Sequence, residues 1–374
     1  MSTNIRELLE EMVRREASDL YITVDSPPMY RVEGSVSAWG GRKYTPEETE
    51  TMALSLMSQV QKTYFARRWE MNLAISYPNL GRFRVNIFRQ RGFFGMVMRH
   101  IKINIKTIDD LGLPQIFKNI AMSKRGLVLV AGRTGSGKST TLAAFIDYRN
   151  SNAGGHIVTV EDPIEFVHVH KKSIVSQREI GIDTHGYGSA LKHTLRQAPD
   201  VILIGEVRDV ETMEAAIDYA ETGHLCLGTI HANNANQTIE RIMNFFPPER
   251  HEQIYMQLSL NLRALISQRL IPTIDKTRVA AVEILLDTPR VKDLIHKAQI
   301  DLLKEAMAQG NLEGMQTFDQ SIFDLYKQGR IDYDNAIAYA DSANDLRLRI
   351  KMDEIGEKKE VMDHGLKIKP EFRT

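Results

Sequence analysis

The residues Gly132–Ser139, with the sequence GRTGSGKS, constrain this chain more than any other stretch. They match the phosphate-binding loop (P-loop) pattern, in which two glycines five positions apart are followed by Lys and then Ser or Thr. Residues 126–131 before the loop are apolar and β-prone, and residues 140–146 after it have a helical composition. This order predicts a strand, a loop and a helix, which favours a P-loop over a glycine-rich turn that happens to end in Lys-Ser.

The residue types of this loop predict binding of ATP with Mg²⁺. Glycines let backbone N–H groups surround an anion, and the N-terminus of the following helix adds partial positive charge. Lys138 is expected to reach the β- and γ-phosphates, and the Ser139 hydroxyl is expected to bind the metal ion. The nucleotide-binding residues predicted here are Gly132, Thr134, Gly135, Ser136, Gly137, Lys138, Ser139 and Thr140.

Composition limits the function classes. The 374 residues predict two or three domains at about 150 residues each. Lys plus Arg and Asp plus Glu both total 48, so no net charge favours nucleic acid or an anionic membrane, although a local basic patch stays possible. Cys226 is the only cysteine, which excludes an intramolecular disulfide and a multi-thiolate metal site. With no signal-like start and no apolar run near 18 residues, we expect a cytoplasmic protein.

The first hundred residues predict a small α+β domain. Residues 4–16 have the apolar spacing of an amphipathic helix, and Thr45 begins a capping box. A hairpin is expected over residues 71–90. In its second strand Arg82 and Arg84 share one face. These arginines indicate either an anionic partner or a solvated polar face, and the strand pattern alone favours the polar face.

Apolar strands then alternate with helices, which predicts an α/β fold with a mostly parallel sheet. We expect four parts: an N-terminal domain over residues 1–101, a linker and entry segment over 102–117, the P-loop domain with C-terminal helices over 118–343, and a charged tail over 344–374. The tail composition predicts a frayed helix followed by disorder. Either a solvated tail or a partner-docking segment fits this composition, and the solvated tail is favoured.

Ionisable residues follow the predicted parallel strands where each strand ends. Glu206 follows the strand at 201–204, and His231 follows the strand at 225–230. Ligands bind at the carboxyl ends of such strands. Glu206 therefore occupies the position of a Walker B acid that holds Mg²⁺, partly through water. His231 could contact the γ-phosphate, although a lone histidine at a strand end more often has a structural role.

ATP hydrolysis also needs a carboxylate that orients or deprotonates the attacking water. Glu165, which follows the strand at 156–160, is our candidate for this catalytic base. Glu161 and Asp162 lie in the same acidic segment and compete for the role.

The chain resembles the type IV pilus retraction ATPases of the secretion ATPase superfamily, the PilT group, and most closely its PilU branch. The resemblance covers about residues 1–345. It rests on the order of several separated motifs: 17–20 with 27–31, 81–86, the P-loop, the acidic box 161–166, the Walker B stretch 200–209 and the histidine box 222–231.

The resemblance implies a PAS-like N-terminal domain, a RecA-like ATPase domain and a ring of six subunits with ATP between the domains. It implies an Mg²⁺-dependent motor for pilus retraction and twitching motility, which works with a paralogous retraction ATPase and an inner-membrane pilus platform protein. The protein would reach the membrane's cytoplasmic face only through partners and would bind no nucleic acid. The site residues that the resemblance implies are Glu165, Glu206, His224, His231, Arg82, Arg84, Arg196 and Arg208.

Two departures from the family pattern keep alternatives open. Lys192 stands where the family usually has arginine, and lysine cannot reproduce a planar bidentate contact. Residues 290–297 keep the apolar spacing of the family's retraction motif but lose its basic pattern. An ATP-binding adaptor with little hydrolysis is therefore one alternative, and a nucleic-acid motor is a weaker one. Because the chain starts at the PAS-like domain and has one cysteine, we expect retraction rather than pilus extension.

Overall fold

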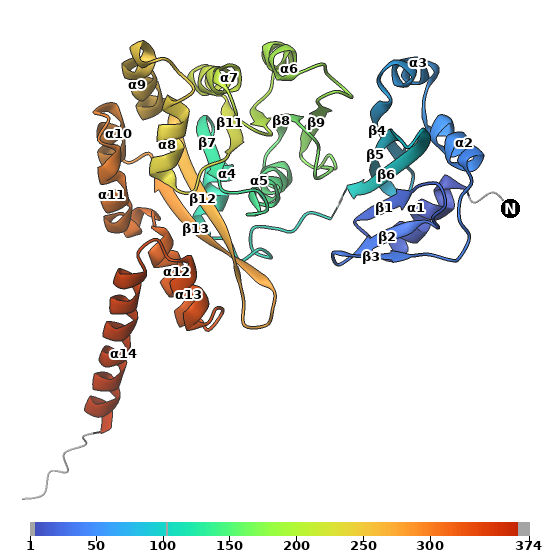
Figure 1. The fold of residues 1–374 in the computed structure, drawn as a ribbon. Coiled ribbons are helices and arrows are strands. Elements are labelled where there is room, and N and C mark those ends of the chain that lie inside the picture. Colours follow the sequence, from blue (N-terminus) through green and yellow to red (C-terminus); the bar gives the residue numbers. More distant parts are fainter. Residues whose placement is uncertain (1–3, 102–103, 366–374) are drawn as a thin grey trace, which may run out of the picture. The chain divides into compact units, whose positions relative to one another are not determined.

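The computed structural model describes residues 4–101 and 104–365 (Figure 1). The chain divides into two compact units, Met1–Ile105 with Arg149–Gly205, and Lys106–Tyr148 with Glu206–Thr374. Residues 102 and 103 of the predicted linker lie outside the described residues. The predicted domain boundaries after residues 101, 117 and 343 stay a prediction.

A six-stranded antiparallel sheet occupies the N-terminal part of the first unit, with the order β3-β2-β1-β6-β5-β4. The predicted helix at 4–16, the capping box and the hairpin are all present. The elements are α1 (Ile5–Arg14), β1 (Asp19–Ile22), β2 (Met29–Val32), β3 (Ser35–Ala38), α2 (Pro46–Leu56), α3 (Gln59–Arg68), β4 (Glu70–Tyr77), β5 (Gly81–Gln90) and β6 (Phe93–Ile101).

Alternation along β5 decides which side chains form the core. Phe83, Val85 and Ile87 are fully buried in one cluster with Leu8 of α1. Arg82 and Arg84, which flank Phe83 in the sequence, are only partly buried on the other face. The predicted two-sided strand is therefore confirmed, because successive side chains of a strand point to opposite faces.

A seven-stranded sheet has the order β13-β12-β7-β11-β10-β8-β9. Strand β8 pairs parallel with β9 and β10, and β7 pairs parallel with β11 and β12, whereas β12 and β13 pair antiparallel. This pairing confirms the predicted α/β fold with a mostly parallel sheet. The strands are β7 (Gly126–Ala131), β8 (Gly155–Glu161), β9 (Ser173–Glu179), β10 (Val201–Ile204), β11 (Leu225–Ile230), β12 (Leu262–Pro272) and β13 (Arg278–Leu286).

Strands β9, β12 and β13 were not predicted from the sequence. β9 carries Ser, Gln, Arg and Glu among its seven residues, and Ile174 is exposed, so its pattern is weak. β12 and β13 form a long hairpin beside α12 and α13 (Figure 1). Their polar residues interrupt the apolar runs, and several of these polar residues are buried.

Helices separate or follow these strands. They are α4 (Ile116–Ala121), α5 (Lys138–Asn152), α6 (Tyr187–Thr194), α7 (Val210–Glu221), α8 (Ala235–Met243), α9 (His251–Asn261), α10 (Pro289–His296), α11 (Leu303–Gln309), α12 (Phe318–Lys327), α13 (Tyr333–Tyr339) and α14 (Ala343–Gly365), with short 3-10 helices at Leu195–Gln197 (η1), Pro248–Arg250 (η2), Ile300–Leu302 (η3) and Asn311–Glu313 (η4).

The C-terminal region differs from the sequence-based expectation. Residues 289–309 form α10, η3 and α11 in succession rather than one continuous helix. Helix α14 continues to Gly365, so most of the charged tail predicted over residues 344–374 is helical. Residues 354–365 include three Glu and two Lys, which are good helix formers, and no proline interrupts the chain between Ala343 and Pro370. Residues 366–374 of the predicted disordered tail lie outside the described residues.

Candidate active site

Backbone geometry at the P-loop explains its glycines. β7 is fully buried and leads into the loop, and α5 begins at Lys138. A Cβ atom on Gly132 would lie 2.3 Å from Ser136 Oγ and 2.7 Å from the Gln268 carbonyl oxygen. Gly137 has a φ of +91°, which favours glycine, and a Cβ there would lie 2.7 Å from Gln268 Nε2. The loop therefore follows a path that side chains at these two positions would block.

Lys138 is buried and curls back over the loop. Its Nζ atom donates to the carbonyl oxygens of Gly132 at 2.8 Å and Arg133 at 3.1 Å. The Ser136 hydroxyl is buried and makes no hydrogen bond with any residue that the structure describes. An ammonium group, an unpaired hydroxyl and the N-terminus of the 15-residue helix α5 fit a bound phosphate chain.

The remaining predicted residues of the loop keep access to solvent. Ser139 and Thr140 are partly buried in the first turn of α5, where helix N–H groups lack partners within the helix. Thr134 and Gly135 are exposed at the tip of the loop. The predicted nucleotide-binding residues 132–140 thus form one continuous loop and first helical turn, with the tip of the loop open to solvent.

The second unit also brings His231 to Glu206. Both side chains are about four-tenths exposed, and His231 Nε2 lies 3.4 Å from Glu206 Oε1. The backbone next to Glu206 is held to β11, because the Val207 N–H donates to the Thr229 carbonyl at 2.8 Å. The sequence placed both residues at strand ends, and the structure adds that their side chains meet.

His224 does not join this pair in its own chain. It precedes β11, whereas His231 follows it, so strand geometry separates the two histidines by about 20 Å. The His224 imidazole Nδ1 lies 3.0 Å from Thr222 Oγ1, and the His224 carbonyl accepts from the N–H of Gly126 at the start of β7. Its predicted nucleotide contact stays a prediction.

Arg208 follows Glu206 and is half exposed, with its Nε atom 4.0 Å from Asp209 Oδ2. Its backbone N–H donates to Thr212 Oγ1 in the capping box of α7, so the backbone here is fixed while the guanidinium stays accessible. This position leaves the predicted nucleotide contact of Arg208 untested.

In the first unit, Glu161 and Glu165, two of the three acids that compete for the catalytic role, have different surroundings. Glu161 Oε1 accepts from Thr159 Oγ1 at 2.6 Å and from Gln177 Nε2 at 3.2 Å. Burial, reinforced by the nearby carboxylate of Glu165, raises the pKa of Glu161 to about 7. Glu165 itself is exposed and makes no hydrogen bond or ion pair within the described part of the chain. Glu165 is therefore a free carboxylate, whereas Glu161 is held in place by its neighbours.

Gln177 is the residue that sequence reasoning missed in this part of the site. It lies on the unpredicted strand β9 and binds Glu161, the Phe166 carbonyl and the His168 N–H. Through these bonds it holds both ends of the acidic segment. No local motif marks this glutamine, so only the pairing of β8 with β9 could identify it.

The predicted arginines of the first unit lie on different elements. Arg84 Nε lies 3.9 Å from Glu179 Oε1, a carboxylate that is almost completely buried. Burial raises the pKa of Glu179, and the positive charge of Arg84 opposes that shift. Arg196 in η1 and Lys192 in α6 are both exposed, one helical turn apart. The roles predicted for these cations stay predictions.

The fold and the loop together define a P-loop ATPase with an additional antiparallel N-terminal sheet. A model of the type II/IV secretion system protein family matches residues 1–311, and the chain belongs to this family. The predicted resemblance is thereby confirmed, and the chain is an ATP-hydrolysing enzyme.

Similar proteins cover nearly the whole chain. The type IV pilus ATPase PilU of Pseudomonas aeruginosa is 54% identical over 347 residues, which are 92% of this chain and 91% of that protein. The retraction ATPase PilT of the same organism is 42% identical over 333 residues, 89% of this chain and 97% of that protein. The crystal structure of the pilus retraction motor PilT with bound ADP has a TM-score of 0.85 at 40% identity, covering 92% of this chain and 99% of that one.

No helix of the described residues is both long and apolar enough to span a membrane.

Proposed function

We propose that the chain is one subunit of a six-membered, Mg²⁺-dependent ATPase ring that drives type IV pilus retraction and twitching motility. The observation that carries the proposal is a complete P-loop, with Lys138 buried over it, in a chain that matches pilus ATPases over about nine-tenths of its length. The ring would act at the cytoplasmic face of the inner membrane with a paralogous retraction ATPase and the pilus platform protein.

In this proposal Lys138 and the first N–H groups of α5 hold the β- and γ-phosphates. Ser139 and Glu206 would hold Mg²⁺, Glu206 partly through water, and the ion would neutralise charge on the phosphate oxygens. Glu165 orients or deprotonates the attacking water, since its carboxylate is exposed and free of partners within the described residues. His231, beside Glu206, contacts the γ-phosphate side.

Further contacts complete the proposed site. Arg82 or Arg84 reaches the phosphates from the N-terminal domain, and Arg196 and Arg208 add positive charge. His224, distant along β11 from His231, would serve the site of a neighbouring subunit. Arg82→Ala and Arg84→Ala should each lower the rate of ATP hydrolysis, and unchanged turnover in both variants would overturn the contribution of the N-terminal domain.

A second candidate function is an ATP-binding adaptor that supports an active paralogue. The observation that favours it is Lys192, exposed one turn before Arg196 where an arginine could form a bidentate contact. Lys192→Arg should raise turnover if this position limits hydrolysis. The predicted nucleic-acid motor has no further support, because the formal net charge is zero.

The deciding experiment measures Mg²⁺-dependent phosphate release from ATP over a range of protein concentrations, with Lys138→Ala and Glu206→Ala as controls. Turnover that rises with subunit assembly and disappears in both variants would support the ring motor. ATP binding with no more phosphate release than in the variants would instead favour the adaptor and overturn the motor.

A further inference from the structure

A short segment joins His231 to helix α8. His231 lies beside Glu206, and α8 begins at Ala235 with Asn234 as its N-cap, whose side chain accepts from the Gln237 N–H at 2.9 Å. Because so few residues lie between the imidazole and the helix, the position of the first turn of α8 restricts where the imidazole can lie.

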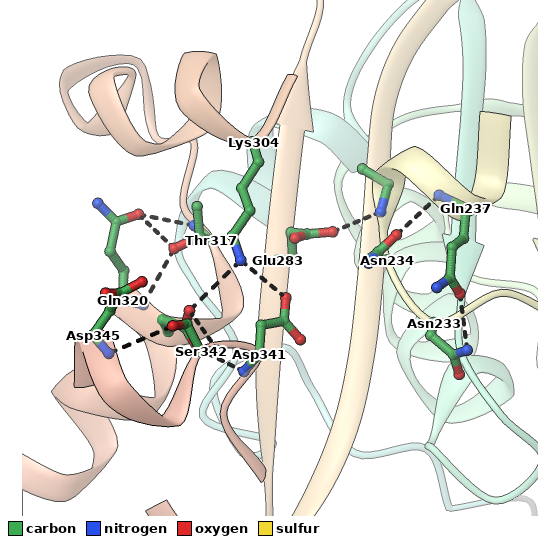
Figure 2. Close-up of polar contacts among 12 residues, drawn as sticks. Asn233, Asn234, Gln237, Glu283, Lys304, Thr317, Gln320, Asp341, Ser342 and Asp345 are labelled. Atoms are coloured by element: carbon green, nitrogen blue, oxygen red, sulfur yellow. Dashed lines mark hydrogen bonds and ion pairs between the residues drawn. The ribbon is translucent and has the colours of Figure 1, made fainter. Parts of the chain in front are cut away.

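Glu283 on β13 holds that first turn. Its Oε1 atom accepts a hydrogen bond from the Ala235 N–H at 2.7 Å, and the side chain is 1% exposed (Figure 2). An acidic group at a helix N-terminus is favourable, since it satisfies a free N–H group and meets the positive end of the helix dipole. Glu283 therefore fixes α8 at the end nearest His231.

Arg269 on β12 holds the residue before the N-cap. Its Nη2 atom donates to the Asn233 carbonyl at 3.4 Å and lies 2.6 Å from Asp341 Oδ1. Its Nη1 atom donates to the Tyr339 carbonyl at 3.0 Å, and the guanidinium lies 3.8 Å from the ring centre of Phe318. Because these partners fix the guanidinium, they also restrict the position of the Asn233 carbonyl to which it donates.

The C-terminal helices hold Asp341 in turn. Lys304 Nζ lies 3.6 Å from Asp341 Oδ2 and 3.7 Å from Asp319 Oδ2 (Figure 2). Asp319 Oδ1 also accepts from the Asp341 N–H at 2.7 Å. The acid that orients Arg269 is thus itself fixed by side chains of α11 and α12.

Arg269 and Glu283 lie on one face of the β12–β13 hairpin, and the P-loop makes a third contact with segment 233–235. Arg269 is opposite Ala281 in the β12–β13 register, so its side chain projects from the same face as that of Glu283. Gln268, next to Arg269 in β12, projects from the opposite face, and its Oε1 atom accepts from Thr141 Oγ1 of α5 at 2.7 Å. In the P-loop, Arg133 Nε donates to Asn233 Oδ1 at 3.0 Å.

We propose that Arg269 and Glu283 are positioning residues for ATP hydrolysis, which hold segment 233–235 so that His231 stays beside Glu206. The proposal rests on the role proposed above for His231. Neither residue needs to touch the nucleotide, because a displacement of a reacting or phosphate-binding group by an ångström is enough to slow the reaction.

The first test separates positioning from binding and folding. Arg269→Ala and Glu283→Ala should each lower kcat about tenfold, with ATP affinity near that of Arg263→Ala, when kcat is measured below the melting temperature of each variant. Arg263 is the matched control because it lies on the same strand but pairs with Asp287. Glu283→Gln should recover most of the lost kcat, since an amide oxygen still accepts from the Ala235 N–H. An unchanged kcat in both alanine variants would overturn the proposal.

The second test asks whether the effect passes through His231. Arg269→Ala and Glu283→Ala should lower kcat no further when His231 is already alanine, because the group that they position is absent. The same fold-loss in both backgrounds would overturn the proposal, and if one variant fails to fold, the other gives the same comparison. If His231→Ala alone leaves kcat unchanged, the role of His231 fails and the inference fails with it. A large loss in His231→Ala beside normal Arg269→Ala and Glu283→Ala enzymes overturns only the inference.

Discussion

Replacing Glu283 by glutamine should change how the stability of the protein depends on pH. Burial, with the nearby Asp341 carboxylate adding to it, raises the pKa of Glu283 from 4.5 to about 7. The folded protein then binds more protons than the unfolded chain between these two values, so this residue makes the free energy of unfolding fall as pH rises through that window. A shift of this size corresponds to about 3 kcal/mol. Glutamine cannot ionise, and its oxygen can keep the bond to the Ala235 N–H.

The assay is urea denaturation followed by circular dichroism at several pH values between 5 and 8. The Glu283→Gln protein should gain stability relative to wild type as pH rises, approaching a difference of about 3 kcal/mol at pH 8. Glu240→Gln, at an exposed position of α8, is the matched control and should show no such trend. Curves for wild type and Glu283→Gln that stay parallel over this range would refute the reasoning.

Three further predictions concern single elements. Lys138→Ala should abolish phosphate release from ATP, because the ammonium proposed to hold the phosphates is lost; residual turnover near wild type would place the site elsewhere. Thr45→Ala removes a complete capping box from α2 and should lower the free energy of unfolding by about 1 kcal/mol, with no loss contradicting that cap's contribution. Phe318→Ala, at a fully buried position beneath the Arg269 guanidinium, should lower it by about 3–5 kcal/mol, and denaturation that matches wild type would show that the site repacks without cost.

Local patterns in the sequence predicted much of the fold. The capping box at Thr45, the two-faced strand β5 and the strand, loop and helix around Lys138 each depend on residues close together along the chain. Their periodicity or cap chemistry therefore appears in the sequence directly. The charged stretch 354–365 shows the limit, because its composition fits both a disordered tail and the helix that forms.

The sequence also predicted that Glu206 and His231 would each follow a strand of the parallel sheet. It did not predict that their side chains meet at 3.4 Å, because the distance depends on rotamers and on the loop that each strand end adopts. The histidine box also did not state how far apart its two histidines would lie. Two histidines of one motif lie at opposite ends of β11, since a strand extends by about 3.3 Å per residue.

By itself, the sequence determined the class of this protein, because a P-loop needs its glycines, lysine and serine at fixed spacing and needs a strand and a helix around them. Only the tertiary structure determined which residues contact the acidic segment and segment 233–235. Gln177, Arg269 and Glu283 lie on strands that carry no clear periodic signal, and they act through partners that are distant along the chain. A buried polar residue is stabilised by whichever hydrogen-bond partner the fold brings to it, and that partner is fixed by strand pairing rather than by its neighbours in sequence.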